Sequence, residues 1–284
     1  MKGRYFHYAA ANVLSRVLPK RFVWGLMRAA ARVYSHFTRD LAAIVSNLEA
    51  VSPDRSDGKG LRRRARRVVV EFAGYLVDLF YSYQLSLSFI ERHVEVRGRE
   101  HLDKALSARK GTIVASAHVG NWEMAGMTLA KLGYPLHGIA LRHRDPRIDR
   151  IFGARREAHG LRVIPLGGSS LRAYRALQAG EVLALNGDRL FGKKGARVRF
   201  LGREVTFPRG LARLSLATGA PVLPVFFVSL GFNRFLLEIQ EPLKTAGEEA
   251  MLRSFASRAE AVIRSYPSQW FIFQPFWEAP AWPD

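Results

Sequence analysis

The chain of 284 residues contains no cysteine. Disulfide bonds, catalytic thiolates and zinc–thiolate sites are therefore excluded. The eight histidines show none of the paired spacings of metal ligands, so we expect no metal ion. A Gly-x-Ser-x-Gly elbow is absent as well, which disfavours a serine esterase. Any catalysis must therefore come from other side chains.

Long apolar runs are also missing. A helix that spans a membrane needs roughly 20 mostly apolar residues. The longest uncharged stretch, residues 214–233, contains two prolines and two glycines, which is typical of a turn and a buried strand. Residues 5–14 lead into Arg16, Lys20 and Arg21 without a small-residue cleavage site, so we expect no secretory signal. The remaining membrane option is attachment at the surface.

Acidic residues are scarce. The sequence has 24 Asp and Glu against 44 Lys and Arg, which gives a formal net charge of +20. Such a charge attracts polyanions, namely nucleic acid, anionic lipid or an acidic protein. We find no zinc-finger, RRM-type or zipper pattern, and therefore expect no nucleic-acid partner. Charge alone still allows a non-catalytic basic protein that binds lipid or nucleic acid, and this is the alternative of a different class.

The N-terminal region has the pattern of two or three helices between residues 5 and 50. Residues 22–34 combine aromatic side chains with interspersed arginines, as a helix in a membrane interface does. An amphipathic helix that covers a core has the same pattern. Five arginines in residues 62–67 either end a solvated helix or contact phosphate or a membrane. We expect residues 1–67 to be a helical, amphipathic part at the membrane surface.

From residue 93 onward, short apolar runs alternate with helix-like segments. The expected strands are residues 94–96, 111–116, 136–141, 161–165, 181–186, 222–229 and 235–239, and the expected helices are residues 100–108, 121–132, 146–159, 169–179, 208–218 and 248–266. This alternation predicts an α/β fold with a largely parallel central sheet flanked by helices. Because no linker interrupts it, we expect a single domain over residues 1–284, with residues 68–284 as its α/β catalytic part.

The segment from His118 to Glu123 joins an expected buried strand to an expected helix, and α/β sheets carry their catalysts at such strand ends. Residues five apart are offset by about 140° on a helix, so these two converge only if His118 lies in the turn. Gly120 permits the turn, and Asn121 can cap the helix. By spacing alone, a role in capping and packing stays open for this segment.

The chemistry of His118 and Glu123 suits the transfer of an acyl group to a hydroxyl group. Histidine accepts the hydroxyl proton near neutral pH. A carboxylate on its other nitrogen fixes the tautomer, and we assign this role to Glu123. Backbone amides near Gly120 are candidates to hold the oxyanion, which makes Gly120 and Asn121 candidate substrate-binding residues. We expect the acyl chain in an apolar groove lined by residues 68–90.

Charged residues follow two further expected strands. Arg142 and Arg144 come directly after residues 136–141 and suit a phosphate group of the acceptor or of a carrier's phosphopantetheine. A solvated basic loop has the same pattern. Asp188 and Arg189 follow the apolar residues 182–185, at the mouth of the same expected site. A salt bridge within a loop is the alternative for this pair.

The string from His118 to Glu123 resembles the HX4E motif of the bacterial lipid A late acyltransferase family, to which the phosphatidylinositol mannoside acyltransferases are similar. The resemblance continues, in order, in residues 94–102, 186–189, 198–203, 207–210, 218–224 and 269–271. It covers roughly residues 68–277. Glu123 favours the lipid A-like branch, because the glycerol-phosphate branch of the superfamily usually has Asp there. Many lipid A transferases begin with a spanning helix, whereas this N-terminus is amphipathic and charged.

This resemblance implies an O-acyltransferase that moves a fatty acyl chain from an acyl carrier protein or coenzyme A thioester to a hydroxyl of a lipid acceptor. The leading acceptor is a lipid A precursor, and another lysophospholipid or a glycolipid is the alternative. The resemblance also implies that Asp188 supports catalysis and that Arg189 binds phosphate. No cofactor beyond the thioester co-substrate is expected. The expected partners are acyl carrier protein, anionic membrane lipid and the acceptor, at the cytoplasmic face of the bacterial inner membrane, with the protein attached peripherally.

Overall fold

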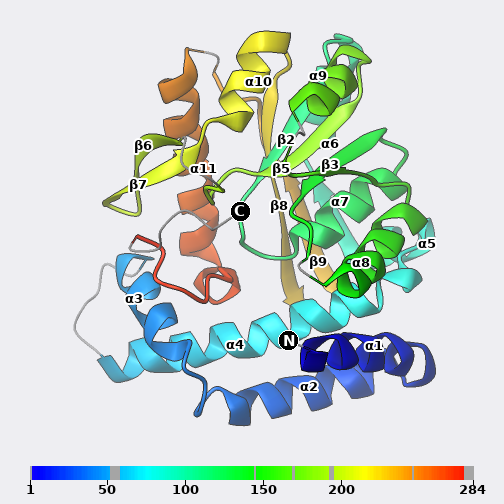
Figure 1. Ribbon diagram of the computed structural model, residues 1–284, viewed down its shortest axis with the longest axis vertical. Coiled ribbons are helices and arrows are strands. Elements are labelled where there is room, and N and C mark those ends of the chain that lie inside the picture. Colours follow the sequence, from blue (N-terminus) through cyan, green and yellow to red (C-terminus); the bar gives the residue numbers. More distant parts are fainter. Residues whose placement is uncertain are drawn as a thin grey trace.

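A computed structural model of the chain describes residues 2–51, 58–143, 145–167, 170–191, 195–244 and 246–277. A seven-stranded sheet runs through the centre in the order β1-β9-β8-β2-β5-β3-β4 (Figure 1). Its strands are β1 (Val94–Arg97), β2 (Thr112–Ser116), β3 (Leu136–Ala140), β4 (Arg162–Pro165), β5 (Val182–Asn186), β8 (Val222–Gly231) and β9 (Arg234–Ile239). All neighbouring pairs are parallel except β8 and β9. The predicted α/β fold with a largely parallel sheet is confirmed.

Strand β2 occupies the middle of this sheet, and its residues are all buried. A central parallel strand is covered by helices on both faces, which explains its unbroken apolar run. Its register with β5 pairs Thr112 with Val182 and Ser116 with Asn186. The two strands therefore end side by side, so the residues that follow them emerge at the same edge of the sheet.

Helices cover both faces of the sheet. In Figure 1, α10 and α11 lie to its left, and α7 and α8 lie to its right. The helices of this part are α5 (Leu87–His93), α6 (Arg99–Ser107), α7 (Trp122–Lys131), α8 (Pro146–Ala158), α9 (Ser170–Gln178), α10 (Gly210–Thr218) and α11 (Glu248–Ser265), with the short 3-10 turns η1 (Ser82–Gln84) and η2 (Pro267–Gln269). A separate antiparallel hairpin of β6 (Gly195–Phe200) and β7 (Arg203–Pro208) packs on α11.

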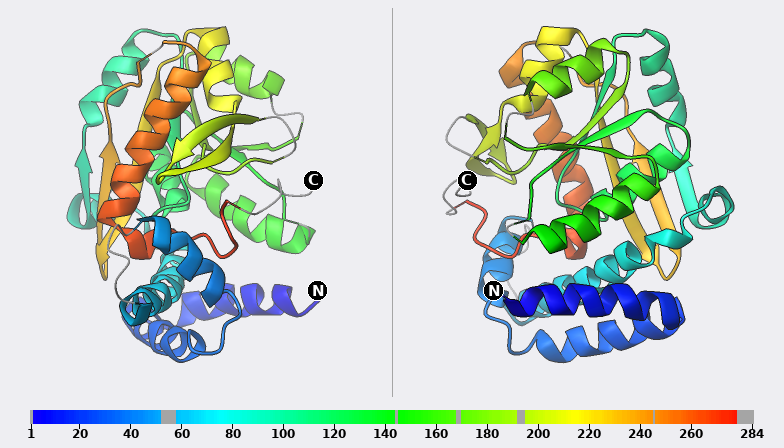
Figure 2. Two further views of the ribbon diagram at one scale, coloured as in Figure 1. Left: turned by 90° about the vertical axis from the view of Figure 1, so that its left-hand side faces the viewer. Right: turned by 45° about the vertical axis from the view of Figure 1, so that its right-hand side comes forward.

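The N-terminal part consists of four helices that lie across the lower end of the molecule in both views of Figure 2. These are α1 (Lys2–Val17), α2 (Lys20–Tyr34), α3 (Leu41–Val51) and α4 (Gly58–Phe80). Helix α4 continues without a break through residues 67 and 68. Its C-terminal half is largely buried, and it packs against α2, α3 and η2.

Two ion pairs tie α2 to α4. Lys20 lies 2.9 Å from Asp78, and both side chains are buried. Arg28 binds both carboxylate oxygens of Glu71 at 2.7 and 3.0 Å. Buried pairs of this kind are costly to break, because each partner would be left as an uncompensated charge. They hold α2 in a defined position against the α/β part.

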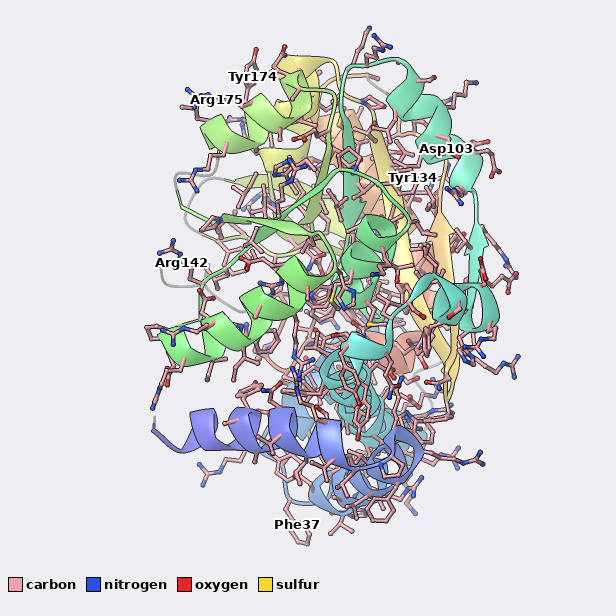
Figure 3. The ribbon with its side chains drawn as sticks, turned by 90° about the vertical axis from the view of Figure 1, so that its right-hand side faces the viewer. Phe37, Asp103, Tyr134, Arg142, Tyr174 and Arg175 are labelled. Atoms are coloured by element: carbon pink, nitrogen blue, oxygen red, sulfur yellow. The ribbon has the colours of Figure 1, made fainter. Side chains whose placement is uncertain are left out.

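Helices α1 and α2 leave many large apolar side chains in contact with solvent. Phe37, just beyond α2, is 79% exposed, and Figure 3 shows it at the lower edge of the molecule, projecting away from the sheet. The others in this part are Val13, Leu14, Val17, Phe22, Leu26, Met27, Val33 and Tyr34. Within the described residues, no helix has the length and apolar character needed to cross a bilayer.

Candidate active site

His118 lies in the turn between β2 and α7, as the strand-to-helix pattern predicted. The turn is fastened on two sides. The backbone oxygen of His118 accepts a hydrogen bond from the amide of Phe271 at 2.9 Å, and the amide of Asn121 donates to Phe227 in β8 at 2.6 Å. Only 14% of the His118 side chain is exposed. The turn that carries the imidazole is thus held in place by two distant segments of the chain.

Asp188 is the carboxylate that binds the His118 ring. It follows β5, and its Oδ1 lies 2.7 Å from Nδ1 of His118, while its Oδ2 accepts the backbone N–H of His118 at 2.8 Å. Burial of its carboxylate disfavours the charged form, yet the contacts with His118 and the nearby charge of Arg189 hold the pKa of Asp188 below its ordinary value. An ionised Asp188 keeps the proton on Nδ1, which leaves Nε2 as the basic nitrogen.

The expected contact between Glu123 and the imidazole is wrong. Glu123 lies in the first turn of α7, where its carboxylate is bound at both oxygens by Arg156 of α8, at 2.8 and 2.6 Å. The side chains are 13% and 9% exposed. A guanidinium satisfies two carboxylate oxygens at once, so Arg156 is the better partner for Glu123. The pair joins α7 to α8 beside the site, and both side chains line its cavity.

Gly120 and Asn121 position the site and do not form its surface. Neither residue lines the cavity that contains His118. The amide of Gly120 donates to Gln269 at 2.9 Å, and the amide of Asn121 is bonded to Phe227, so neither is available to an oxyanion. Gly120 has φ +67°, and a Cβ there would lie 2.1 Å from the oxygen of Phe227. The Asn121 side chain caps α7 through the amide of Met124, as predicted.

A cavity of about 1120 Å³ opens beside His118. This volume suits a large ligand, since pockets for drug-sized molecules measure about 300–1,000 Å³. Its apolar wall comes mainly from α9, α10 and the segment after β5, with the residues Leu166, Leu171, Tyr174, Leu190, Phe191, Leu211 and Leu214. Of residues 68–90, only Phe72 contributes to the cavity. The expected groove over residues 68–90 is therefore wrong, because most of the apolar side chains of that stretch are buried in the core.

Positive charge gathers on the polar side of the cavity. Arg189, Arg209 and Arg213 line it together with Arg156, and among the described residues that line it Glu123 is the one carboxylate. Glu248 binds Arg209 and Arg213 at 3.2 and 3.4 Å from outside the lining. The cavity thus combines a long apolar wall with a cationic rim.

The predicted basic loop after β3 contributes less to this cavity than expected. Arg142 is exposed and lines a separate hollow of about 280 Å³ with Arg172, and Figure 3 shows it at the edge of the molecule. Arg144 lies outside the described residues. Arg189, predicted to bind phosphate, does line the main cavity. From the same loop, His143 reaches the cavity and packs on Phe152 with ring centroids 4.6 Å apart.

Sequence reasoning missed Arg156, Arg209 and Arg213 as residues of this site. Arg156 is one of two adjacent arginines near the end of α8, and nothing in the local pattern distinguishes it from its neighbour Arg155. Only the packing of α8 against α7 brings it to Glu123. Arg209 lies in the short stretch between β7 and α10 that carries the family resemblance, which was the available signal. Among the described residues, no cluster of three or more metal-binding side chains occurs.

Comparison with known proteins points to acyltransferases. The chain matches the model of the family described as bacterial lipid A biosynthesis acyltransferase over residues 2–279. It is 28% identical over 286 residues to a phosphatidylinositol mannoside acyltransferase of Mycolicibacterium smegmatis, with 96% of this chain and 90% of the relative covered. It is 27% identical over 288 residues to the enzyme of the same description from Mycobacterium tuberculosis, covering 96% and 88%. The matched region therefore includes the N-terminal helices, beyond the residues 68–277 inferred from motifs.

Proposed function

Because the chain belongs to the bacterial lipid A biosynthesis acyltransferase family, we propose that it transfers a fatty acyl chain from an acyl thioester to a hydroxyl group of a lipid acceptor, with His118 as general base. The observation that carries this proposal is the His118–Asp188 pair, whose ring nitrogen and carboxylate oxygen lie 2.7 Å apart. The pair adjoins a cavity with an apolar wall and a cationic rim. These are the groups that a hydroxyl, an acyl chain and a phosphate require.

His118 takes part in both steps of the proposed reaction, first as a base and then as an acid. Nε2 of His118 takes the proton of the acceptor hydroxyl while the oxygen attacks the thioester carbonyl. The carbon–sulfur bond then breaks, and the imidazolium returns its proton to the leaving thiolate. Asp188 stabilises the imidazolium in between and keeps the ring in the productive tautomer. We assign Arg189, which lines the same cavity, to the negative charge that develops on the carbonyl oxygen.

Glu123 acts in this proposal through Arg156. The bidentate pair fixes the guanidinium against the wall of the cavity, and its net charge is close to zero. Its contribution is therefore the shape of the site and the spacing of α7 and α8. The two end residues of the HX4E motif then have different roles: His118 takes part in the reaction, and Glu123 positions Arg156.

We propose a phosphorylated glycolipid as the acceptor class, with a lipid A precursor as the leading candidate. Arg209 and Arg213 at the cavity suit a phosphate group near the acceptor hydroxyl. A phosphatidylinositol mannoside is the second candidate, and the 28% identity to an acyltransferase of that description over 96% of the chain supports it. Both candidates combine sugar hydroxyls with phosphate.

We further propose that the donor is an acyl carrier protein or coenzyme A thioester and that the protein is attached peripherally to the cytoplasmic face of the bacterial inner membrane. The net charge of +20 suits both an acidic carrier protein and anionic lipid. The exposed apolar side chains of α1 and α2 suit the interface of a bilayer.

The test is acyl transfer with the purified protein, radiolabelled acyl carrier protein and acyl coenzyme A in parallel, and a panel of lipid acceptors in vesicles. His118→Ala is the test variant. His101→Ala, a change of the same type on α6, is the matched control. We expect transfer by the native chain and the control, and a loss of several orders of magnitude in His118→Ala. Equal activity of the two variants would contradict the assignment of the base, and the best acceptor decides between the two glycolipids.

A further inference from the structure

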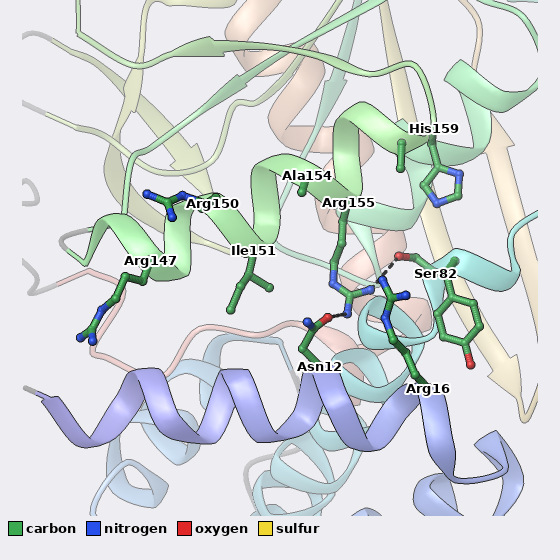
Figure 4. A pocket seen from close by; sticks show the side chains of 11 residues that line it. Asn12, Arg16, Ser82, Arg147, Arg150, Ile151, Ala154, Arg155 and His159 are labelled. Atoms are coloured by element: carbon green, nitrogen blue, oxygen red, sulfur yellow. Dashed lines mark hydrogen bonds between the residues drawn. The ribbon is translucent and has the colours of Figure 1, made fainter.

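A second cavity, of about 420 Å³, lies between α8 and α1 (Figure 4). It is enclosed by α1, the turn η1 and α8. An ordered water molecule occupies about 30 Å³ in the liquid, so the space admits a ligand far larger than one water. Arg155 and Arg156 are adjacent on α8 but serve different cavities: Arg156 binds Glu123 beside His118, whereas Arg155 lines this one.

The lining of this second cavity is strongly cationic. It contains Arg16 of α1, together with Arg147, Arg150 and Arg155 of α8 and His159 at the end of that helix, and none of the described residues that line it is acidic. Arg147 has a carboxylate partner in Asp145, 2.8 Å away. Positive side chains repel one another in a confined space, so such a set is expected where an anion is bound.

Arg155 is fixed at the centre of the set. Its guanidinium donates to the backbone oxygen of Phe80 at 2.8 Å and to Oδ1 of Asn12 at 2.7 Å, and both acceptors are uncharged. Its Nε is buried and has no hydrogen-bond partner in the described part of the chain. Burial and the charge of Arg16 lower the pKa of Arg155 to about 10, so the group stays charged at neutral pH. The structure therefore holds a rigid cation whose charge its own hydrogen bonds do not neutralise.

His159 adds a second group with unused bonding capacity. The residue is 8% exposed, and its Nδ1 is buried without a hydrogen-bond partner among the described residues. Its ring bonds to the backbone of Ser82. Figure 4 shows the imidazole at one end of the cavity and Arg150 toward the other, with Arg155 and Arg16 between them. Buried polar atoms normally have partners, so Nε of Arg155 and Nδ1 of His159 are exceptions, and both belong to side chains that line this cavity.

Exposed apolar side chains lie close to the lining residues along the chain. Val13 and Val17, each next to a lining residue of α1, are 60% and 73% exposed. Tyr83 of η1 lines the cavity and is itself 47% exposed, and Leu87 lies close to it in the chain with 52% exposed. A phosphate group among arginines, bordered by exposed apolar side chains, is the chemistry of a phospholipid that keeps its headgroup in a pocket and its chains in the bilayer.

We propose that this cavity between α1, η1 and α8 binds the phosphate group of an anionic lipid, at a site separate from the reaction at His118. The lipid seats the protein on the membrane with α1 against the bilayer and holds α8, whose next arginine forms part of the reaction cavity. This binding is specific to one place on the surface, in contrast to the diffuse attraction that a net charge of +20 exerts on any anionic membrane.

The experiment compares two double variants of equal charge change. Arg16→Glu with Arg150→Glu alters the cavity, and Arg197→Glu with Arg258→Glu alters exposed arginines of β6 and α11. Binding of the full chain to vesicles is measured by co-sedimentation at constant ionic strength, with phosphatidylglycerol in phosphatidylcholine and with phosphatidylcholine alone. We expect the cavity variant to bind anionic vesicles at least about tenfold more weakly than the matched variant, with no difference on neutral vesicles. Equal binding of the two variants would overturn the proposal.

Two further arms decide the source of the phosphate. Methyl phosphate, with chloride as the ionic-strength control, is expected to raise the melting temperature of the native chain and of the matched variant, but not that of the cavity variant. If methyl phosphate does so while vesicle binding is equal, the site takes a soluble phosphate and the lipid assignment is wrong. If acyl carrier protein, and not vesicles, separates the variants, the cavity is a protein docking site and the proposal also fails. Should the double variant not fold, Arg150→Ala against Arg258→Ala repeats the comparison.

Discussion

Replacing Asp188 by Asn tests the central feature of the site. Asparagine has the same shape, and its oxygen can still accept the backbone N–H of His118, which now bonds to Oδ2 at 2.8 Å. Its amide group, however, presents N–H donors to Nδ1, where Oδ1 now lies 2.7 Å away. The ring then shifts its proton to Nε2, the nitrogen that must act as base. The variant should fold and yet lack the reactive tautomer.

The expected loss is large. The same change in a serine protease triad lowers kcat by about 10⁴. At about 1.36 kcal/mol per tenfold change, this corresponds to roughly 5 kcal/mol of transition-state stabilisation. We expect a loss of about 10³–10⁴ in kcat for Asp188→Asn, with a smaller change in KM, because the carboxylate is fully buried and its bonds are to His118. The assay is initial-rate acyl transfer over a range of acceptor concentrations.

Asp103→Asn is the matched control. Asp103 accepts a hydrogen bond from Tyr134 at 2.6 Å, and Figure 3 shows the two together at an edge of the molecule far from Arg142. It should keep native kcat. The double variant His118→Ala with Asp188→Asn should be no slower than His118→Ala alone, because the two residues act as one unit. A folded Asp188→Asn protein with kcat within tenfold of native would refute this reasoning.

Four further predictions concern stability and selectivity. Glu123→Gln removes the charge partner of Arg156 and should lower the free energy of unfolding, measured by urea unfolding, by about 3–5 kcal/mol. The double variant Glu123→Leu with Arg156→Met should recover most of this stability. A double variant as unstable as Glu123→Gln would contradict the ion-pair account. In Gly120→Ala the added Cβ would lie 2.1 Å from the Phe227 oxygen, and the residue would have to keep φ +67°. The free energy of unfolding should therefore fall by more than about 2 kcal/mol in the same assay. A native-like urea midpoint would contradict this prediction. Burial and Arg156 lower the pKa of His143 below 6.5, so its contribution to stability is complete above that pH and is lost as pH falls through the folded pKa. Urea midpoints should therefore fall between pH 7 and pH 5, and fall less in His143→Gln; an equal fall in both proteins would exclude His143 as the cause. Leu214→Trp fills part of the apolar wall and should shift the preferred donor toward shorter acyl chains in a competition assay, whereas unchanged preference would place the chain elsewhere.

The fold class followed from the sequence because each local signal agreed with the global one. The run of residues 111–116 is apolar and short, so it predicts a buried strand, and β2 is such a strand. His118 follows this strand and Asp188 follows β5, so both were expected at strand ends. The paired register of Ser116 with Asn186 brings those ends together. That β2 and β5 are neighbours depends on the order of the sheet, which no local pattern reveals.

The carboxylate partner of His118 shows where local reasoning fails. Glu123 is close in sequence and has the right chemistry, so spacing favoured it. In the folded chain Arg156 of α8 binds both oxygens of Glu123. Asp188, which lies 70 residues from His118 in the sequence, binds the ring of His118. Which partner a charged group binds depends on how the helices and strands pack, because a hydrogen bond needs its two atoms within about 3 Å. Distance along the chain does not determine that.

The sequence by itself determined the α/β alternation, the turn that presents His118, the excess of positive charge and the absence of thiol chemistry, because each depends on residue type or on neighbours within a few positions. Only the tertiary structure decided that Asp188 is the partner of His118, that the apolar wall comes from α9 and α10 instead of α4, and that adjacent arginines of α8 line two different cavities. These outcomes depend on which elements pack together. Packing is a property of the whole chain, because all buried surfaces must fit closely against one another in the same structure.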